Sequence, residues 1–278
     1  MGNYAMDLQL DGKVALVTGS SKGIGQGIAQ ALAQEGAIVV LHGRNKAKAE
    51  EAANDIVAQG GRAYVVVGDL TNEDDVQRLI DQAQSFVKPV QIVVNNAGGS
   101  GPSEDWTTTR PENWALGYDK NVLAAVRVTT RLLPGMRELQ WGRVVNISSL
   151  AALMPPAKRP DYAAAKAAMI AMTASLAKSV AKDGITANCV SPGTIRSASL
   201  EQAFRAAAAT RGLAMDAPWS DIEKTALPMF ADVPMGRVGT LEEIRMPCRF
   251  WSAPGLAISL GRTSGWMAGC GLGCSAGL

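Results

Sequence analysis

The sequence is poor in the residues that most often carry hydrolytic or metal chemistry. Its 278 residues include a single histidine, His42, and four cysteines, three of which lie beyond residue 240. His42 would have to be the base of any Ser-His-Asp hydrolase, so we do not expect one. No histidine lies near Cys270 and Cys274 to complete a zinc site, so we expect no metal. The cysteines do not form a disulfide framework in a chain of this size.

Charge and long apolar runs are also scarce. Charged residues make up 19% of the chain and the net charge is +2, with no basic block. This balance argues against nucleic-acid binding. No stretch of about 18 apolar residues is free of charge, so we expect no membrane span. The first residues carry Asp7 and Asp11 and no apolar signal core, so we expect a cytoplasmic protein.

What the chain does contain is a repeated pattern of a strand followed by a helix. Short apolar runs of this kind predict buried parallel strands, and six are found, at residues 14–18, 38–41, 63–67, 90–94, 143–147 and 185–190. No repeat or linker divides the chain. We therefore predict one α/β domain over residues 1–278, a doubly wound parallel sheet with helices on both faces. One long helix is predicted over residues 114–136.

A glycine-rich turn follows the first predicted strand. Gly19, Gly23 and Gly25 have the spacing Gly-x3-Gly-x-Gly and lead directly into a helical pattern. Without Cβ atoms, backbone N–H groups and the helix N-terminus can approach a diphosphate. An ordinary strand-to-helix turn is the alternative, but the strand before and the helix after favour dinucleotide binding.

The end of the second predicted strand bears on the choice of nicotinamide. An acidic residue there would bind the free 2′-hydroxyl of NAD(H), whereas an Arg accommodates the 2′-phosphate of NADP(H). The acid is absent and Arg44 is present, with Lys22 as a second cation. NADP(H) is therefore preferred over NAD(H), although both cations are also compatible with a solvated surface. His42 is interpreted as a strand-end residue. Asp69 is a candidate acceptor from the adenine amino group, although the segment also fits a helix start capped by Thr71 or Asn72.

Tyr162 and Lys166 lie four residues apart on a predicted helix. This spacing places them on one helical face. A nearby ammonium stabilises a phenolate and lowers the phenol pKa from about 10. The pair is therefore a candidate general acid/base, although such pairs are also common on amphipathic helices.

Together these motifs resemble the short-chain dehydrogenase/reductase family. They stand in its order and spacing from about Leu8 to Glu243: Thr18-Gly-x3-Gly-x-Gly25, Asn95-Asn-Ala-Gly98, Asn121, Ser149, Tyr162-x3-Lys166 and Pro192-Gly193. The resemblance implies a Rossmann-like sheet of about seven strands. It also implies hydride transfer between a nicotinamide and a small-molecule carbonyl or alcohol, in a homotetramer.

Residue roles follow from the same resemblance. Tyr162 would be the proton donor or base, Lys166 would lower its pKa and hold the nicotinamide ribose, and Ser149 would bond the substrate oxygen. Asn121 would position a water. Cofactor contacts are implied for Gly19, Ser21, Lys22, Gly23, Ile24, Gly25, Arg44, Asn45, Asp69, Leu70, Asn96, Ala97, Gly98, Tyr162, Lys166, Pro192, Gly193, Ile195 and Ser197.

The nearest activity by resemblance is that of a 3-oxoacyl-thioester reductase, although many carbonyl reductases share these motifs. A non-catalytic NADP-binding regulator is an alternative from another class. An epimerase or dehydratase on the same fold would usually have a longer chain. The family's substrate lid falls at about residues 197–235. Its many apolar residues fit either an uncharged or partly apolar ketone or packing of the lid on its own domain.

The tail departs from the family pattern. Ile244-Arg-Met-Pro247, Ile258-Ser-Leu-Gly261 and Trp266-Met-Ala-Gly269 replace the usual segments. Codons for the usual segments, read one base late, give these residues in order. We interpret about residues 245–269 as such a shifted reading; a diverged tail is the alternative. Pro247 is expected to interrupt the helix at its start.

Overall fold

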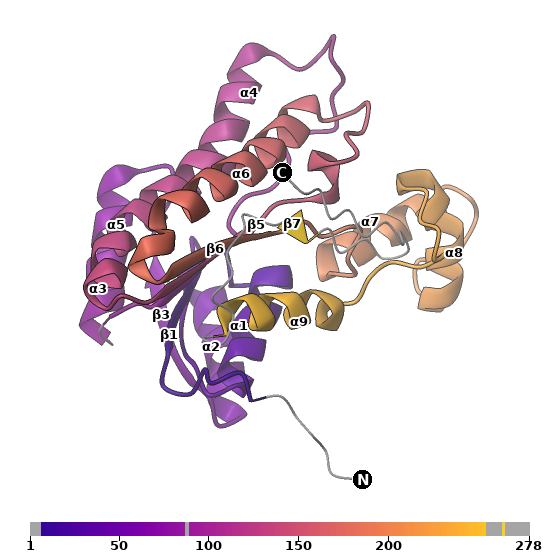
Figure 1. Ribbon diagram of the computed structural model, residues 1–278. Helices are drawn as coiled ribbons and strands as arrows, with labels where there is room; N and C mark the ends of the chain where they lie inside the picture. The colour runs from indigo at the N-terminus through magenta and orange to yellow at the C-terminus, as the bar shows by residue number, and fades with distance from the viewer. Residues whose placement is uncertain (1–6, 87–88, 254–262, 265–278) are drawn as a thin grey trace.

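The chain forms a parallel sheet of seven strands. The computed structural model describes residues 7–86, 89–253 and 263–264. The spatial order is β3-β2-β1-β4-β5-β6-β7 (Figure 1). The strands are β1 (Val14–Val17), β2 (Ile38–Gly43), β3 (Arg62–Val67), β4 (Ile92–Asn95), β5 (Gly142–Ile147), β6 (Ile185–Val190) and β7 (Thr263–Ser264).

Helices cover both faces of this sheet, as predicted. The first face packs against α1 (Gly23–Gln34), α2 (Lys46–Ala58) and α9 (Leu241–Ser252). The other face packs against α3 (Glu73–Phe86), α5 (Ala124–Glu138) and α6 (Pro160–Val180). Figure 1 shows these two layers on either side of the strands. The expected α/β doubly wound architecture is confirmed.

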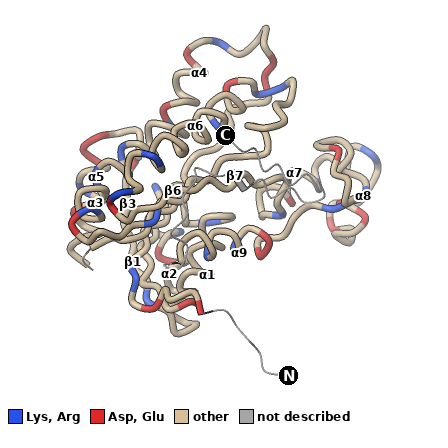
Figure 2. Tube along the Cα trace, in the orientation of Figure 1, with Lys and Arg blue, Asp and Glu red and all other residues tan. Residues whose placement is uncertain are grey.

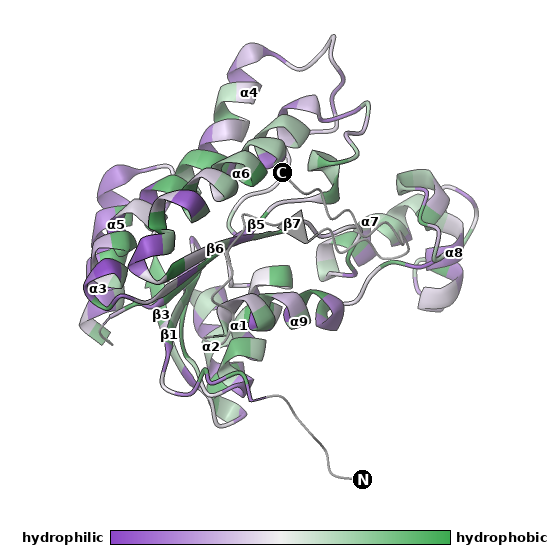
Figure 3. Cartoon of the chain, viewed as in Figure 1, coloured by the Kyte–Doolittle hydropathy of each residue, from purple (hydrophilic) through white to green (hydrophobic). Residues whose placement is uncertain are grey.

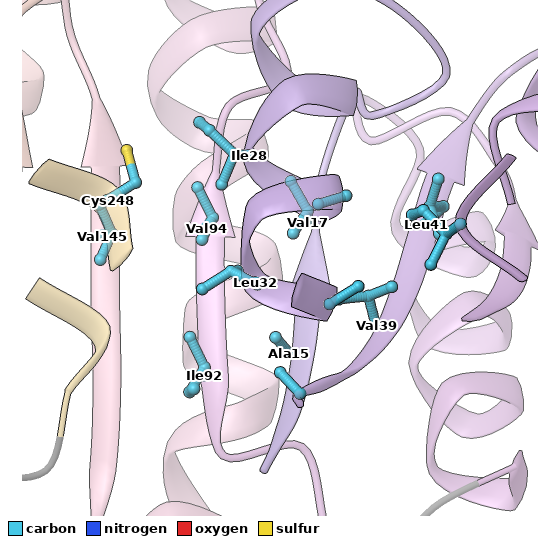
Figure 4. Close-up of a cluster of buried hydrophobic side chains, with 14 of the residues drawn as sticks. Ala15, Val17, Ile28, Leu32, Val39, Leu41, Ile92, Val94, Val145 and Cys248 are labelled. Atoms are coloured by element: carbon cyan, nitrogen blue, oxygen red, sulfur yellow. The ribbon is translucent and has the colours of Figure 1, made fainter. Parts of the chain in front are cut away.

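The apolar segments predicted as strands form the hydrophobic core together with the helices that cover them. Ala15 and Val17 of β1 face Ile28 and Leu32 of α1 in one buried cluster (Figure 4). In Figure 3 the strands near the labels β1 and β3 are coloured mostly hydrophobic, and helices such as α1 and α6 carry hydrophobic bands as well. Complete burial on both faces is what βαβ crossovers require of a parallel strand.

The order of the strands fixes where a ligand can bind. From β1 the chain runs outward to β2 and β3, and then returns to β4 on the other side of β1. In open α/β sheets, a crevice forms at this reversal, outside the carboxyl ends of the strands. The turns after β1, β4, β5 and β6 therefore meet at one edge.

One of the six strands predicted to be buried is an edge strand. β3 pairs only with β2, and within it Tyr64 and Val67 are exposed. The Tyr64 ring stacks on Phe86 of α3, with 5.0 Å between ring centroids. An apolar run does not distinguish an edge strand from a central one. The number of neighbouring strands depends on the order of strands in the sheet, which a local segment does not contain.

The predicted long helix over residues 114–136 is three segments. α4 (Pro111–Tyr118) leads through a π-helical turn (Asp119–Leu123) into α5. Asn121 lies within this π turn and is fully buried. Its side chain bonds to the backbone of α4 and of the loop after β4. These tertiary bonds stabilise an irregularity of the kind that is frequent at functional sites.

Pro247 does not interrupt α9, contrary to expectation. The helix begins with a capping box between Thr240 and Glu243 and runs on through the proline. Arg245 bonds to Gln30 and Arg249 to Glu35, both on or beside α1. Packing and ion pairs on α1 thus offset the lost backbone bond. Of the tail at residues 245–269, residues 254–262 and 265–269 lie outside the described residues.

The predicted lid is a pair of helices, α7 (Ala198–Ala209) and α8 (Trp219–Phe230), that project from one end of the molecule (Figure 1). Phe204 of α7 is fully buried and stacks on Trp219, 5.8 Å between centroids. The lid's apolar residues therefore pack largely on one another, with Met215 and Met229 exposed. This arrangement favours the second of the two interpretations given for the lid.

Basic and acidic side chains are interspersed along the chain, with no extended face of one sign in the view of Figure 2. Within the described ranges, no helix has the length and apolar character needed to cross a bilayer. Those ranges also hold no cluster of three or more His, Cys, Asp or Glu suited to a metal ion.

Candidate active site

The turn after β1 is fastened to the turn after β4 by one threonine. The Thr18 hydroxyl accepts from the backbone N–H groups of Asn96 and Ala97, both at 3.0 Å. The Asn96 side chain in turn donates to the carbonyls of Thr18 and Gly19, both at 3.0 Å. A Cβ on Gly25 would lie 2.4 Å from the Asn96 amide nitrogen. Only glycine permits this approach, so the two motifs form one rigid unit.

The outer side of the same turn is open. A Cβ on Gly23 would meet nothing within 4 Å, and Lys22, the exposed N-cap of α1, makes no side-chain capping bond. The first N–H groups of α1 therefore have no side-chain cap. Such a terminus is suited to an anion. This is the geometry that the predicted diphosphate site requires.

His42 is a strand-end residue, as interpreted, but it also holds the glycine turn. Its Nδ1 accepts from Gly19 N–H at 3.1 Å, and its Nε2 lies 3.1 Å from the Gly68 carbonyl. Accepting at Nδ1 requires the neutral ring with its proton on Nε2, which then donates to Gly68. Burial lowers the pKa of His42 below 6.5, which favours this neutral form.

The predicted 2′-phosphate residues lie beyond β2 and β3. The Arg44 guanidinium is 80% exposed and lies 3.9 Å from the Asp69 carboxylate. Asp69 accepts from the backbone and hydroxyl of Thr71, and these bonds lower its pKa. Arg44 is thus free to turn toward a phosphate. The side chain of Asn45 is used otherwise, because it caps α2 by accepting from Lys48 N–H.

Tyr162 projects from the first turns of α6 toward the end of β5. Its hydroxyl shares a hydrogen bond with Ser149, the residue to which the resemblance assigns the substrate oxygen. Burial raises the pKa of the Tyr162 phenol, while the Ser149 bond and the charge of Arg159 act in the opposite direction. In this state Tyr162 is a protonated phenol, which can act as a proton donor.

Lys166 lies one turn further along α6 and is almost fully buried. Its ammonium donates to the Ile147 carbonyl at 2.8 Å and lies over the Tyr162 ring, 5.8 Å from the centroid. Its hydrogen bonds go to the Ile147 carbonyl and the Met169 sulfur, not to the phenol oxygen. Desolvation lowers the pKa of Lys166 to about 8. The helical spacing thus brings the pair together, with the ammonium over the face of the ring.

Asn121 is joined to the site through glycine backbone. Its amide nitrogen donates to the carbonyls of Gly99 and Gly117, and its oxygen accepts from Gly99 N–H at 2.9 Å. A Cβ on Gly98 would lie 2.4 Å from that oxygen and 3.6 Å from Lys166 Nζ. Both amide hydrogens are therefore occupied, so any water that Asn121 positions must bind elsewhere on the residue.

The turn after β6 closes the site beside Ser149. The Pro192 carbonyl accepts from Leu150 N–H at 2.8 Å, which ties the ends of β5 and β6 together. Ile195 is buried and bridges to Gly239, and Ser197 caps α7 by accepting from Leu200. The remaining predicted positions lie in the same turns. Leu70 has its side chain in the core, which leaves only its backbone for a cofactor.

The sequence motifs did not predict three groups that support the site. These are the Thr18 hydroxyl that joins two turns, the His42 ring that holds the glycine turn, and a buried chain of side-chain hydrogen bonds. In that chain Asn95 donates to Asn146 at 2.8 Å, and Asn146 donates to Thr173 at 2.8 Å. The available signal was a polar residue inside an apolar strand, as at Asn146. Its partners, 27 and 51 residues away, are not visible in a local pattern.

Comparison with known proteins identifies the family. The family model described as short chain dehydrogenase matches residues 13–208. The chain belongs to this family. It is 33% identical over 256 residues to the 3-oxoacyl-[acyl-carrier-protein] reductase FabG of Pseudomonas aeruginosa, covering 92% of this chain and 96% of that protein. The short-chain dehydrogenase is thus an oxidoreductase, and its similarity to 3-oxoacyl reductases is confirmed.

Two solved structures show the same fold in complexes with different nicotinamides. The L-sorbose reductase of Gluconobacter frateurii, complexed with NADPH and L-sorbose, superposes with a TM-score of 0.87 at 30% identity, covering 95% of this chain and 98% of that one. A xylitol dehydrogenase bound to NAD+ superposes with a TM-score of 0.83 at 27% identity, covering 94% and 100%. The fold alone therefore does not select the nicotinamide.

Proposed function

We propose that this short-chain dehydrogenase transfers a hydride between NADP(H) and a ketone or secondary alcohol, with Tyr162 as the general acid/base. The observation that carries the proposal is the hydrogen bond between the Tyr162 and Ser149 hydroxyls, with Lys166 on the next turn. These groups lie at the strand edge that also bears the open glycine turn. A proton donor and a dinucleotide site are what carbonyl reduction by a nicotinamide needs.

The residues at this edge fit a nicotinamide dinucleotide. The uncapped start of α1 and the open face of Gly23 suit the diphosphate. Lys166, which lacks a carboxylate partner among the described residues, suits the hydroxyls of the nicotinamide ribose. When bound, the nicotinamide supplies or accepts the hydride. The protein's own part is to orient the substrate and to move one proton.

In reduction, Tyr162 donates its phenolic proton to the carbonyl oxygen, and Ser149 donates a hydrogen bond to the same oxygen. Burial keeps the phenol protonated until it is needed. In oxidation, Tyr162 must first lose that proton. The nearby charges of Lys166 and Arg159 stabilise the phenolate in that direction. General acid/base assistance of this kind contributes about 10²–10⁴-fold to a rate.

NADP(H) is preferred because of the groups beyond β2. Arg44 is present where an acid would favour NAD(H), and its only described carboxylate neighbour, Asp69, is 3.9 Å away and bonded to Thr71. A 2′-phosphate would be a stronger partner for a guanidinium than this distant carboxylate. The NADPH complex of the similar sorbose reductase supports the preference.

A 3-oxoacyl-thioester reductase is the second candidate, supported by the similarity to FabG over nearly all of both chains. The non-catalytic regulator is disfavoured because the Tyr162, Ser149 and Lys166 set is assembled. By family resemblance we also propose a homotetramer, which light scattering after gel filtration tests.

The test is a panel of simple ketones, keto sugars and 3-oxoacyl thioesters, each with NADPH and NADH, followed by the absorbance of the reduced nicotinamide. Turnover with NADPH in preference to NADH supports the proposal, and the best substrate separates the two candidates. Tight NADPH binding without turnover of any carbonyl would favour the regulator instead.

A further inference from the structure

The buried chain of side-chain hydrogen bonds links two central strands to the helices on one face of the sheet. Asn95 of β4 and Asn146 of β5 lie opposite each other in the parallel register. Asn95 donates to Thr129 of α5 at 2.9 Å and to Asn146 at 2.8 Å. Asn146 in turn donates to Thr173 of α6 at 2.8 Å. All four side chains are buried, so the chain joins β4 and β5 to α5 and α6.

Hydrophobic packing alone does not account for this chain. The positions two residues earlier on the same strands, Val93 and Val144, are apolar and belong to the core. An amide in such a place is costly unless it is hydrogen-bonded. What the amides add is direction, because a hydrogen bond fixes the positions of donor and acceptor, whereas hydrophobic contact is non-directional.

Three successive residues at the end of β5 bond to α6. Asn146 bonds to Thr173, as described above. The Ile147 carbonyl accepts from the Lys166 ammonium at 2.8 Å, and the Ser148 hydroxyl donates to the Lys166 carbonyl at 2.7 Å. Lys166 and Thr173 are seven residues apart, about 10.5 Å along the helix axis. A helix attached at Lys166 alone could tilt about that point, whereas the second attachment at Thr173 fixes its direction.

The direction of α6 determines where the proposed proton donor lies. Tyr162 is one turn before Lys166, and its hydroxyl shares a hydrogen bond with Ser149, the residue that follows the three attached residues of β5. Tyr162 and Thr173 lie on opposite sides of Lys166 along the helix. A tilt about Lys166 that carries Thr173 off Asn146 would therefore also carry Tyr162 off Ser149. O–H···O bonds span only about 2.5–3.0 Å, so a displacement of about 1 Å would break this one.

We infer that Asn146 and Thr173 are positioning residues, whose hydrogen bond holds α6 on β5 so that the Tyr162 hydroxyl meets Ser149. The inference rests on the proposed function and assigns the bond a role in kcat. Cofactor binding should be nearly independent of it. The proposed diphosphate and 2′-phosphate contacts lie at α1 and beyond β2, and Lys166 keeps its own bonds to β5.

The test removes the Thr173 hydroxyl with Thr173→Val and follows NADPH oxidation by ethyl acetoacetate and by the fastest ketone of the substrate panel. Because a misplacement of about 1 Å can cost about 100-fold in rate, kcat should fall about 10- to 100-fold. The Kd for NADPH, from fluorescence titration, should stay within about twofold. Thr173→Ser keeps the hydroxyl and should hold kcat within about threefold of the wild type.

Thr129→Val is the matched control. Thr129 is a buried threonine at the other end of the same chain and also accepts from an asparagine amide, but it lies on α5, away from Tyr162 and Lys166 in the sequence. Both valine variants leave a buried N–H without its acceptor, so both should lower Tm by several degrees. Well below either Tm, Thr129→Val should keep kcat within about twofold of the wild type.

A wild-type kcat in Thr173→Val would overturn the inference. An equal fall of kcat in Thr129→Val would overturn it as well, because the chain would then be a general support of the fold. If Thr173→Val does not fold, Thr173→Cys and Thr129→Cys repeat the comparison, since a thiol is only a weak acceptor. The same difference in kcat is expected between them, and equal values would count against the inference.

Crystal structures make the test independent of turnover. The Tyr162 and Ser149 hydroxyls should lie more than about 3.0 Å apart in Thr173→Val and remain bonded in the wild type and in Thr129→Val. If they separate in Thr173→Val and the wild type reduces no carbonyl with either nicotinamide, the proposed function fails while the positioning role stands. If carbonyls are reduced, and neither the separation nor kcat changes in Thr173→Val, the positioning role fails while the proposed function stands.

Discussion

Replacing Lys166 by methionine should stabilise the protein while abolishing its activity. Lys166 is a buried ammonium whose described contacts, the Ile147 carbonyl and the Met169 sulfur, include no carboxylate. Burial lowers its pKa from 10.5 to about 8. A shift of about 2.5 units corresponds to about 3 kcal/mol at 1.36 kcal/mol per unit, so the charged form destabilises the folded state by that order at pH 7.

Methionine has a similar length and no charge. It removes the desolvation cost but also the charge-assisted bond to the Ile147 carbonyl, which is worth about 1.5–3 kcal/mol. The net gain in the free energy of unfolding is therefore at most about 1.5 kcal/mol at pH 7. For a domain of this size, a gain of about 1 kcal/mol raises Tm by about 2–4 °C. Lys178→Met, an exposed lysine on the same helix, should stay within about 0.5 kcal/mol of the wild type.

The pH dependence gives the sharper signature. The pKa of Lys166 is lower in the folded than in the unfolded state, so between about pH 8 and 10.5 the unfolded chain binds more protons. Wild-type stability should thus gain a contribution as pH rises through this window and lose it as pH falls through 8. Lys166→Met lacks this contribution, so the two stabilities should converge toward pH 10. Urea unfolding followed by tryptophan fluorescence measures both; a variant less stable at pH 7 with the wild-type pH slope would refute the reasoning.

Four further predictions concern the cofactor, the proton and the tail. Tyr162→Phe should lower the rate of reduction by about 10²–10⁴-fold and leave NADPH binding nearly intact, as fluorescence titration would show; a wild-type rate would remove Tyr162 from the mechanism. Arg44→Asp should shift the kcat/KM ratio from NADPH toward NADH, because a 2′-phosphate would face a like charge; an unchanged ratio means that Arg44 does not reach it. Because burial lowers the pKa of His42 below 6.5, stability should fall as pH drops below about 6.5, where the unfolded chain takes up the proton first; His42→Asn should lose this slope, and an identical slope in urea titrations would contradict the assignment. For residues 245–269, intact mass and tryptic peptides of the purified protein should decide whether the chain carries the sequence as written, and a DNA read without paired insertions or deletions relative to close relatives would exclude the one-base shift.

The sequence predicted those parts of the site that depend on short-range spacing. The glycine turn, Arg44 and the Tyr162–Lys166 pair each lie within one strand end or one helix, where periodicity and turn chemistry operate. The parallel strands β1, β4 and β5 were equally readable, because burial on both faces demands continuous apolar runs. These features were enough to predict the fold class and the side chains proposed to bind the cofactor and move the proton.

The supports of the site could not be predicted in this way. Thr18 meets Asn96 across 78 residues, and the π turn at Asn121 depends on bonds to Gly99. Nor does spacing reveal that Lys166 would lie over the Tyr162 ring, or that Arg159 would lack a carboxylate. Each depends on which loops the sheet order brings together, a property of the assembled topology and not of any local segment.

These unpredicted details have one thing in common, which supports the proposed anionic ligand: positively charged groups near the site lack acidic partners among the described residues. At the carboxyl edge of the sheet, the start of α1 has no side-chain cap, Lys166 has only neutral contacts, and the Arg159 Nε has no hydrogen bond among the described residues. Away from that edge, Arg249 bonds to Glu35 and Glu242 on the first face of the sheet. At the carboxyl edge, therefore, folding leaves positive charge without a carboxylate partner among the described residues. Because uncompensated buried charge is costly, the ligands that relieve it should be anionic. The proposed dinucleotide phosphate at the start of α1 meets that requirement.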